Sequence, residues 1–571
     1  MRYFGGSFAP GGGPLPLPSN ARWKLGRSSG NVWTTSGTLQ VQVAEVPPQH
    51  RWAAVIGTHD VTKPELERWL GTRSGTPTAP PAWPGSYTVV VGDELSVSVF
   101  ADPAHAAPIY YTEVNGVIVW ASSSYALSGL VRVDIDVDWM TCLVLDPAGF
   151  DPADRSAFKG IAMVPPGHRL DLGVSCPATV RRWWSTPRPV HPNRAAAALR
   201  RALEDAVNLR LRESRTVSFD LSGGLDSTSL CLLAAERAMP GQRLIACTVR
   251  PENVGHGGDL DHARAALTEH GNIQHLVIPL GGDSAPYAEF MDALATDEPA
   301  PSTITKARHQ RGYELVVAHG STVHVSGDGG DGLLMQSPEH TLRLARRGRL
   351  LRALRDLHGW AKLNRVSPAR LAGDMAYSRR RPSLPQPWLT PRALERCVRH
   401  PLRSPGSGTE LAGLVGVGRT ARADVQVADE SGVRLENPFL DRTVIEAALK
   451  FPITHRGSPW EYKPQITTAM ADVLPPAVLH RRTKGGTDAD HHRGLRANLD
   501  SVLDLADGWL ASHGIIDPCA LRTELRRAAS GRATAWGLLE PVIASEVWAR
   551  SVESASSPDW GEDAERSEAL T

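Results

Sequence analysis

A run of six residues, 222–227, has the composition of a loop that binds phosphate groups. It reads Ser-Gly-Gly-Leu-Asp-Ser and lies between a strand-like segment, 217–221, and a helical pattern, 227–239. Glycines let backbone N–H groups approach an anion closely, and the start of a helix favours negative charge. The serine hydroxyls add donors, while the Gly-Lys-Ser/Thr ending of the Walker loop is absent. The run therefore predicts an anion cradle, the alternative being a glycine turn that only joins a strand to a helix.

Three other motifs carry residues that could act on a bound phosphate ester. Residues 326–331 read Ser-Gly-Asp-Gly-Gly-Asp, and residues 434–441 read Arg-Leu-Glu-Asn-Pro-Phe-Leu-Asp. Residues 481–486 read Arg-Arg-Thr-Lys-Gly-Gly and come after Leu-Pro-Pro at 474–476. Carboxylates suit Mg²⁺, which needs only one or two protein ligands beside phosphate oxygens. The lysine before two glycines predicts a cation on a movable loop.

The elements that must position these motifs alternate between strands and helices. The pattern predicts helix 194–212, strand 217–221, helix 227–239, strand 244–249, helix 261–270, strand 275–280 and, after another helix, strand 322–325. This alternation is typical of an α/β fold with a doubly wound parallel sheet. Ligands of such sheets bind outside the carboxyl ends of the strands, and both glycine-rich motifs lie directly after strand ends.

The front of the chain has a different pattern. Residues 1 to about 185 are β-rich, with strand-like segments at 87–91, 95–99 and 117–121. A polar stretch with prolines, 185–193, predicts a linker between this β-rich part and the alternating part.

Two later regions stand outside the alternating pattern. Residues 341–404 are arginine-rich and helical in pattern, with leucines at 350, 354 and 357. This region is either a solvated helical insertion or a docking surface for a partner or peptide. The acidic, serine-rich end of the chain, from about residue 553, predicts disorder. We therefore expect one domain over 1–190, a second over 191–555 and a disordered tail over 556–571.

Composition limits the class of protein. Of the 571 residues 41% are hydrophobic and 22% charged, and the formal net charge is +1, so nothing favours a nucleic-acid partner. Six scattered cysteines include no C-x-x-C pair, which argues against a zinc site or disulfide scaffold and suits a reducing cytosol. Neither a signal peptide nor a run of 18 apolar residues is present. We expect a cytoplasmic protein with no membrane span.

Read in order, the four motifs and the β-rich front resemble the asparagine synthetase family from end to end. In the front part, 108–111 (Pro-Ile-Tyr-Tyr), 158–160 (Phe-Lys-Gly) and 165–168 (Pro-Pro-Gly-His) resemble that family too. The resemblance implies an N-terminal β-sandwich like the class II glutamine amidotransferases. It also implies a C-terminal synthetase domain with a pyrophosphate loop, of the kind that splits ATP into AMP and pyrophosphate.

The front part departs from the glutamine-dependent members of that family. Those members begin with a cysteine at position 2 that releases ammonia from glutamine, whereas this chain has Arg2. Their Asn-Gly-Glu turn aligns with Ile-Gly-Thr at 56–58. Arginine cannot supply a thiolate nucleophile. We therefore expect a glutaminase-like fold without its chemistry, which supports the synthetase domain, shapes a substrate cleft or receives a partner.

Two groups that resemble this pattern use an amine already present in the substrate. They are the β-lactam or carbapenam synthetases and the macrolactam synthetases (cyclases) of lasso peptides. The front sequence, Asp-Glu-Pro at 297–299 and the long insertion resemble the lasso cyclases most. That resemblance implies a linear core peptide as substrate, a leader-binding protein and a leader peptidase as partners, and a cleft larger than asparagine synthetase needs. Ring size and the choice of Asp or Glu stay open.

The resemblance also assigns roles to residues. ATP is bound by Leu221, Ser222, Gly223, Gly224, Asp226, Ser227, Val249, Ser326 and Gly327. Asp226 and Asp331 resemble magnesium ligands, and Lys484 resembles the lysine that stabilises the transition state, a role worth about 2.7–4 kcal/mol per donor. Glu436 and Asp328 are candidates for the base that deprotonates the amine or for groups that orient it. A structural role for Glu436 is the alternative.

Other functions remain open at this point. Within the same chemistry, the rivals are an ammonia-dependent asparagine synthetase and a β-lactam-type cyclase of a small amino acid. A tRNA-modifying ATPase shares the Ser-Gly-Gly-x-Asp-Ser loop but lacks this front domain. An inactive scaffold is the non-enzymatic alternative, against which both aspartates and the lysine argue.

Overall fold

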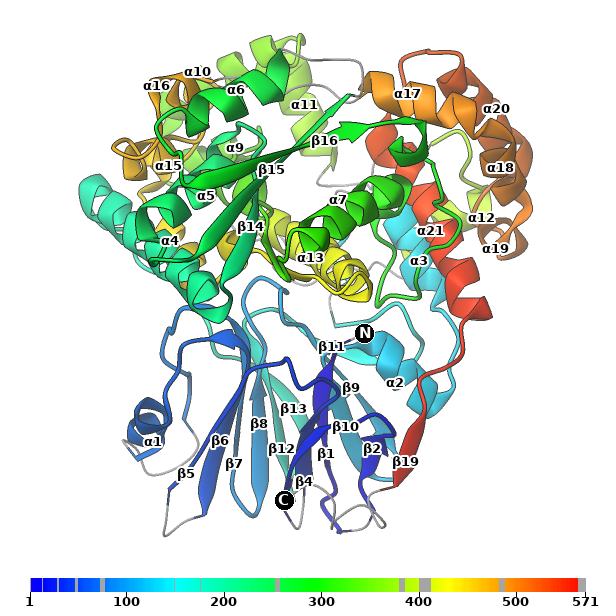
Figure 1. Cartoon of the computed structure of the whole chain (residues 1–571). Coiled ribbons are helices and arrows are strands. Elements are labelled where there is room, and N and C mark those ends of the chain that lie inside the picture. Colours follow the sequence, from blue (N-terminus) through cyan, green and yellow to red (C-terminus); the bar gives the residue numbers. More distant parts are fainter. Residues whose placement is uncertain are drawn as a thin grey trace.

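The computed structural model of the chain contains two parts, one built on antiparallel sheets and one on a parallel sheet with helices (Figure 1). The structure describes residues 2–12, 14–27, 30–46, 50–71, 77–147, 149–152, 154–174, 176–251, 257–378, 386–399, 412–481 and 488–562. Within these ranges no helix combines the length and hydrophobicity needed to cross a membrane.

The front part is a sandwich of two antiparallel six-stranded sheets. The first has the order β11-β9-β10-β1-β4-β3, with β1 Phe4–Phe8, β3 Trp23–Arg27, β4 Gly30–Thr34, β9 Ile109–Val114, β10 Val117–Ala121 and β11 Ala162–Val164. The second has the order β13-β12-β8-β7-β6-β5, with β5 Val41–Val46, β6 Arg51–His59, β7 Gly85–Gly92, β8 Ser96–Phe100, β12 His168–Gly173 and β13 Cys176–Arg182. Each of the three expected strand segments coincides with β7, β8 or β10 to within two residues, so the β-rich front is confirmed.

The two sheets enclose one apolar core. Phe8 and Trp120 from the first sheet pack with Trp52 and Val90 from the second. Helix α1 (Lys63–Gly71) covers the outer face of the second sheet through Leu66 and Leu70. Helices α2 (Ser124–Val131) and α3 (Val137–Leu145) lead toward the other part.

The second part is built on a five-stranded parallel sheet. Its order is β16-β15-β14-β17-β18, with β14 Thr216–Asp220, β15 Arg243–Pro251, β16 Ile273–Leu280, β17 Val323–Val325 and β18 Arg434–Glu436. The chain moves outward from β14 to β16 and then crosses back to β17, so the strand order reverses between β14 and β17. The predicted parallel sheet is confirmed, while β18, only three residues long, was missed because so short a run has no visible alternation.

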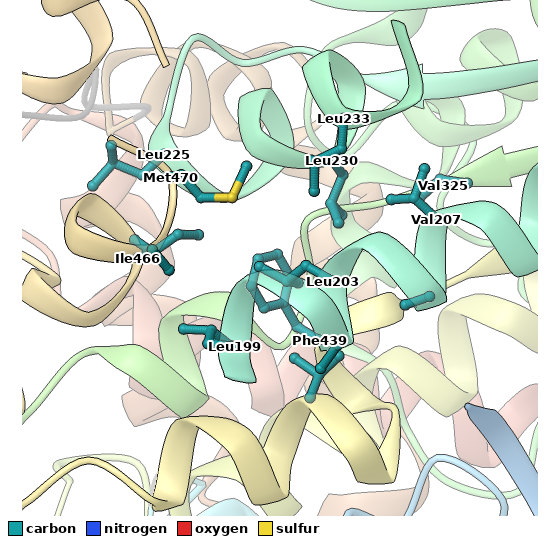
Figure 2. Close-up of a cluster of buried hydrophobic side chains, with 14 of the residues drawn as sticks. Leu199, Leu203, Val207, Leu225, Leu230, Leu233, Val325, Phe439, Ile466 and Met470 are labelled. Atoms are coloured by element: carbon teal, nitrogen blue, oxygen red, sulfur yellow. The ribbon is translucent and has the colours of Figure 1, made fainter. Parts of the chain in front are cut away.

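Helices cover this sheet and bury the larger core. The sequence-predicted helices are α4 (Pro192–Glu213), α5 (Leu225–Arg237), α6 (Gly258–Leu267) and α7 (Lys306–Ala318). Figure 2 shows Leu203 of α4 beside Phe439, with Leu230 and Leu233 of α5 and Val325 of β17 around them. This packing holds the ends of β14 and β17 rigidly.

Further helices surround the sheet. The arginine-rich region forms α9 (His340–Arg346), α10 (Leu350–Leu363), α11 (Pro368–Ser378) and α12 (Pro391–Arg399). The others are α8 (Gly330–Leu334), α13 (Ala412–Glu430), α14 (Arg442–Leu449), α15 (Pro464–Ala469), α16 (Pro476–Leu479), α17 (Asp488–Ala497), α18 (Leu499–Leu503), α19 (Trp509–Ser512), α20 (Pro518–Ala529) and α21 (Trp536–Ser554).

The end of the chain is more ordered than its composition predicts. Residues up to Ser554 belong to α21, and β19 (Trp560–Glu562) pairs antiparallel with β2 (Pro16–Pro18) of the front part. Trp560 packs edge-on against the buried Trp33. The expected disorder is therefore wrong for 553–562, because the packing of Trp560 on Trp33 stabilises this segment despite its polar composition. Residues 563–571 lie outside the described residues.

A buried arginine holds two carboxylates that join the two parts. Arg210 of α4 is fully buried and donates to Glu436 Oε2 at 3.0 Å and to Asp441 Oδ1 at 2.8 Å. From the front part, Thr58 donates to Glu436 at 2.8 Å and Ser86 donates to Asp441 at 2.9 Å. A buried charge needs such partners, because its desolvation is otherwise not compensated.

We expect Arg210→Ala to destabilise the protein by about 3–5 kcal/mol, because it leaves two buried carboxylates without their counter-charge. Thermal unfolding of the full chain measures the change. Arg212→Ala, at an exposed arginine near the end of the same helix, is the matched control and should melt like the wild type. Equal melting temperatures for both variants would contradict this role of Arg210.

Candidate functional site

The first glycine-rich loop connects β14 to α5. Gly223 has a φ of +65°, which favours glycine, and Gly224 precedes α5 without a side-chain cap. Ser222 and Ser227 lie across the loop from each other, with their hydroxyl oxygens 3.0 Å apart. The Ser222 N–H also donates to Ser227 Oγ at 3.2 Å. An uncapped helix start beside two hydroxyls provides the donors of an anion cradle.

The second glycine-rich loop packs directly on the first. A Cβ atom at Gly327 would lie 2.9 Å from the Ser227 nitrogen, and one at Gly330 would lie 2.4 Å from the Asp226 carboxyl carbon. Only glycine fits at either position without a shift of its neighbour. The two loops therefore form one site at the point where the strand order reverses, where open α/β sheets bind ligands.

A lysine that the sequence did not reveal lies between the two aspartates of these loops. Lys463 is almost completely buried, and its Nζ contacts Asp226 Oδ2 and lies 2.5 Å from Asp331 Oδ1. Burial lowers the pKa of Lys463, but the two carboxylates outweigh burial and raise it. Asp226 is 237 residues away in sequence, so no local motif marks this lysine.

The same contacts test whether Asp226 and Asp331 suit a magnesium ion. Both carboxylates reach one ammonium group, so they are close enough to share one cation. Mg²⁺ takes one or two carboxylates and completes its shell with phosphate oxygens and water. Among the described residues no cluster of three or more His, Cys, Asp or Glu side chains could hold a metal. The pair fits an ion that arrives with a nucleotide.

The remaining predicted nucleotide contacts fall around the same sheet edge. The Ser326 N–H donates to the Glu436 carbonyl at 2.9 Å, and Val249 is 38% exposed on β15. Leu221 donates its N–H to Cys247 at 2.8 Å and accepts from Thr248 Oγ1 at 2.6 Å. Both backbone groups of Leu221 therefore already have partners within the sheet, and its side chain is buried in the core, so its predicted contact with adenosine stays a prediction.

The predicted catalytic residues fall in different surroundings. Lys484 lies outside the described residues, and its role stays a prediction. Glu436 is buried and pairs with Arg210 and, at 3.2 Å, with Arg434. It borders a cavity of about 140 Å³ between the sandwich and α13, whereas Asp328 borders another. The two acids do not face one cavity, and the contacts of Glu436 are those of the structural alternative.

The cavity beside Asp328 has a volume of about 370 Å³ and an acidic wall. Besides Asp328 it is bordered by Asp424 of α13 and by Glu298, which accepts from Arg419 Nε at 2.8 Å. Burial raises the pKa of Asp424 to about 7; a hydrogen bond from Ser302 opposes this rise, and the charge of Asp328 adds to it. Arg419 also borders the cavity, and most of the remaining wall is proline and other apolar residues: Leu143, Pro147, Pro299, Pro301, Val417, Ala421, Pro541 and Ala544.

The sequence did not single out Asp424, because an aspartate within a helix is usually exposed to solvent. Helix α13 has two different faces. Thr420, Ala421 and Asp424 face the 370 Å³ cavity, while Gln426 and Asp429 face the 140 Å³ cavity. The helix is thus the shared wall of the two cavities, and only the tertiary structure reveals it.

Arg2 anchors the start of the chain on that helix. Its backbone N–H donates to Asp429 Oδ2 at 2.8 Å, and its side chain pairs with the same carboxylate. It also donates to Thr38 Oγ1 and the Val433 carbonyl, both at 3.3 Å. The residues that border this cavity include no cysteine. Arg2 is thus held in an ion pair between the front part and α13.

We expect Gly330→Ala to weaken binding of magnesium-ATP at least about tenfold, or about 1.4 kcal/mol, because the new methyl group displaces the Asp226 carboxylate. Titration calorimetry measures the affinity. Gly271→Ala, whose Cβ meets nothing within 4 Å, should bind like the wild type. Unchanged affinity in Gly330→Ala would mean that the contact between the two loops does not determine the affinity for magnesium-ATP.

We expect Lys463→Met to reduce magnesium-ATP-dependent pyrophosphate release by about 10²–10³-fold, the usual effect of losing one preorganised charge. Lys463→Arg should retain part of the rate, because it keeps a cation near both carboxylates. Lys63→Met, at a largely exposed lysine of α1, controls for loss of charge alone. A Lys463→Met rate within a few-fold of the wild type would exclude this lysine from phosphate binding.

Relatives with known names share parts of this chain. It is 25% identical over 261 residues to "Amidase chyE" of Penicillium rubens, covering 41% of this chain and 38% of that protein. It is 30% identical over 163 residues to the carboxyethyl-arginine beta-lactam-synthase of Streptomyces clavuligerus (27% and 29% covered). It is 25% identical over 138 residues to asparagine synthetase [glutamine-hydrolyzing] 1 of Bacillus subtilis (24% and 22%). The matches thus span 22–38% of these relatives' lengths.

A solved structure and a family model match this chain as well. The glutamine phosphoribosylpyrophosphate amidotransferase of B. subtilis matches with 10% identity and a TM-score of 0.22, covering 51% of this chain and 83% of that one. The asparagine synthase family model matches residues 198–550, which include both glycine-rich loops, Lys463 and Asp424. The chain therefore belongs to the asparagine synthase family, whose members are ATP-dependent, AMP-forming ligases that make carbon–nitrogen bonds.

Proposed function

We propose that this protein is an ATP-dependent lasso peptide cyclase. It activates an Asp or Glu side-chain carboxylate of a leaderless core peptide as an acyl-adenylate and releases pyrophosphate. The peptide's own N-terminal amine then attacks, forms an isopeptide macrolactam and releases AMP. The observation that carries the proposal is the combination of two assembled phosphate loops with Arg2 at the position of a glutaminase nucleophile. An enzyme so built would activate a carboxylate without ammonia from glutamine, and we propose that its amine comes from the substrate rather than from free ammonia.

The first step uses the residues of the two loops. Ser222, Gly223, Gly224 and Ser227 are proposed to bind the pyrophosphate end of ATP, and Ser326, Gly327, Leu221 and Val249 to border the adenosine. Asp226 and Asp331 would hold Mg²⁺, which neutralises phosphate charge when bound. Lys463 adds a buried cation beside the same phosphates. Lys484 is proposed to stabilise the charge that develops on the α-phosphate and acyl group.

The second step needs a neutral amine. An α-amine has a pKa near about 8, so a weak base within hydrogen-bonding distance is sufficient. Asp424 is the best candidate, because burial raises its pKa to about 7 and it borders the same cavity as Asp328. Asp328 adds negative charge that would attract the incoming ammonium, whereas Glu298 is neutralised by its ion pair with Arg419. The ion pairs of Glu436 with Arg210 and Arg434 favour a structural role for it instead.

The substrate is proposed to occupy the cavity of about 370 Å³ that these acids border. Its volume lies within the usual range for ligand pockets, about 300–1,000 Å³. A cavity of this size has room for the reacting ends of the peptide and not for the whole peptide. Holding the amine and the acyl-adenylate there would bring them together in a defined geometry. A leader-binding protein and a leader peptidase would supply the core peptide.

A second candidate is a β-lactam-type cyclase of a small amino acid. It is favoured by the 30% identity to a carboxyethyl-arginine beta-lactam-synthase. Such a reaction uses the same activation and an internal amine, but a much smaller substrate.

Mass spectrometry separates the two candidates. The full chain is incubated with magnesium-ATP and either a linear peptide, with a free N-terminus and an internal acid, or carboxyethyl-arginine. Loss of one water from the peptide, dependent on ATP and on Lys484, supports the cyclase. An N-acetylated peptide and one with Asn or Gln for the acid are controls and should stay linear. Two outcomes would contradict the macrolactam proposal. One is a peptide that is adenylated and then only hydrolysed, and the other is conversion of carboxyethyl-arginine alone.

We expect Asp424→Asn to slow amide formation by about 10²–10⁴-fold while pyrophosphate release persists. The wild-type rate should rise with pH through about 7, and the variant should lose that rise. Quenched-flow measurement of both products from pH 5 to 9 provides the profile. An unchanged pH profile in the variant would remove Asp424 from the role of base.

The same variant has an independent stability signature. The pKa of Asp424 is raised from its ordinary value of 3.8 to about 7 in the folded protein. Protonated Asp424 therefore contributes its full stability below about pH 4, and this contribution to stability is lost as the pH rises through 7. Asp424→Asn should therefore melt above the wild type at pH 8, and the difference should vanish near pH 4. Asp374→Asn, at an exposed aspartate of α11, should show no such pH dependence.

A further inference from the structure

Helix α10 exposes a patch of leucines that the proposed reaction does not use. Leu350, Leu351 and Leu354 are 60%, 86% and 64% exposed, while Ala353 and Gly359 on the other side of the helix are buried against the protein. Large leucines with this exposure, adjacent on one face, mark interaction surfaces. We call these three residues the leucine patch.

The leucine patch lies within a strongly cationic segment. Residues 346–355 read Arg-Arg-Gly-Arg-Leu-Leu-Arg-Ala-Leu-Arg and contain no acidic residue. Arg346, Arg349 and Arg355 are exposed around the leucines. The whole chain has a net charge of only +1, so the positive charge is a local feature. A binding partner must offer apolar side chains and negative charge together.

The side of α10 away from the leucine patch is fixed to the protein. Trp460 donates its indole N–H to the buried Asp356 at 3.1 Å, and a Cβ atom on Gly359 would lie 2.7 Å from Trp460. These contacts hold the helix with the leucine patch facing outward. An amphipathic helix presents leucines on one face beside carboxylates, whereas a nucleic acid gains little from exposed leucines.

We propose that the leucine patch and its surrounding arginines dock an acidic amphipathic helix of a partner protein. Leucines of the partner pack on Leu350, Leu351 and Leu354, and its carboxylates pair with the arginines. The proposal stands whichever amine or acid the enzyme joins.

The test uses the full chain and a fluorescent synthetic helix that has leucines on one face and glutamates on the others. Fluorescence anisotropy should show binding that weakens with added salt, as screening of charge requires. Leu351→Glu/Leu354→Glu and, separately, Arg349→Glu should weaken binding by about tenfold or more. Leu95→Glu, at a leucine 67% exposed beyond the sandwich strand β7, is the matched control and should bind like the wild type. Melting temperatures verify that every variant is folded.

Several outcomes would overturn the proposal. These are absence of binding, equal binding of a scrambled peptide whose leucines are spread around the helix, or equal loss in the Leu95→Glu control. Patch-dependent binding of phosphatidylserine vesicles or of single-stranded DNA without peptide binding would reassign the surface to a membrane or nucleic acid. Self-association that disappears in Leu351→Glu/Leu354→Glu would reassign it to a second copy of the chain.

Discussion

The close contact between the two glycine-rich loops is the constraint on which the site depends. Gly327 and Gly330 approach Ser227 and Asp226 so closely that a single methyl group would collide. This contact is possible only because β14 and β17 are neighbours in the sheet, at the point where the strand order reverses. It brings Asp226 and Asp331 within reach of one cation, and Lys463 lies between them. The strand order, the two glycines and the charges of Lys463 and the aspartates therefore together produce one predicted phosphate site.

Helix α13 relates this site to the front part of the molecule. One face carries Asp424 into the acidic cavity, and the other carries Asp429 to Arg2. Arg210 holds the neighbouring carboxylates of Glu436 and Asp441 in the same interface. Ion pairs thus lie along the interface between the two parts. The sandwich has a structural role in this chain, because it contacts the helix that forms one wall of the 370 Å³ cavity.

Much of this architecture was predictable. The strand and helix alternation after residue 190 identified four of the five parallel strands, since each has a recognisable apolar run, and the β-rich front was evident from its short strands and turns. The pairing of the 222–227 and 326–331 loops was expected from the rule that such sheets bind ligands at strand ends. Strand β18 and the ordered segment up to Glu562 were missed, because β18 (Arg-Leu-Glu) and β19 (Trp-Gly-Glu) each have a single large apolar residue, unlike the equally short β17, and are specified by their pairing partners.

The sequence by itself determined the class of chemistry: a glycine loop before a helix favours phosphate, paired aspartates favour Mg²⁺, and Arg2 excludes a thiolate. The first of these conclusions needs only residue type and short spacing, whereas the roles of the aspartates and of Arg2 rest on the resemblance to the asparagine synthetase family. The tertiary structure alone decided which distant groups share a cavity. It brought Lys463 to aspartates more than a hundred residues away, put Asp424 beside Asp328, and separated Glu436 from both. Burial and charge pairing act through space, so the pKa of Asp424 and the partners of Glu436 have no signature along the chain.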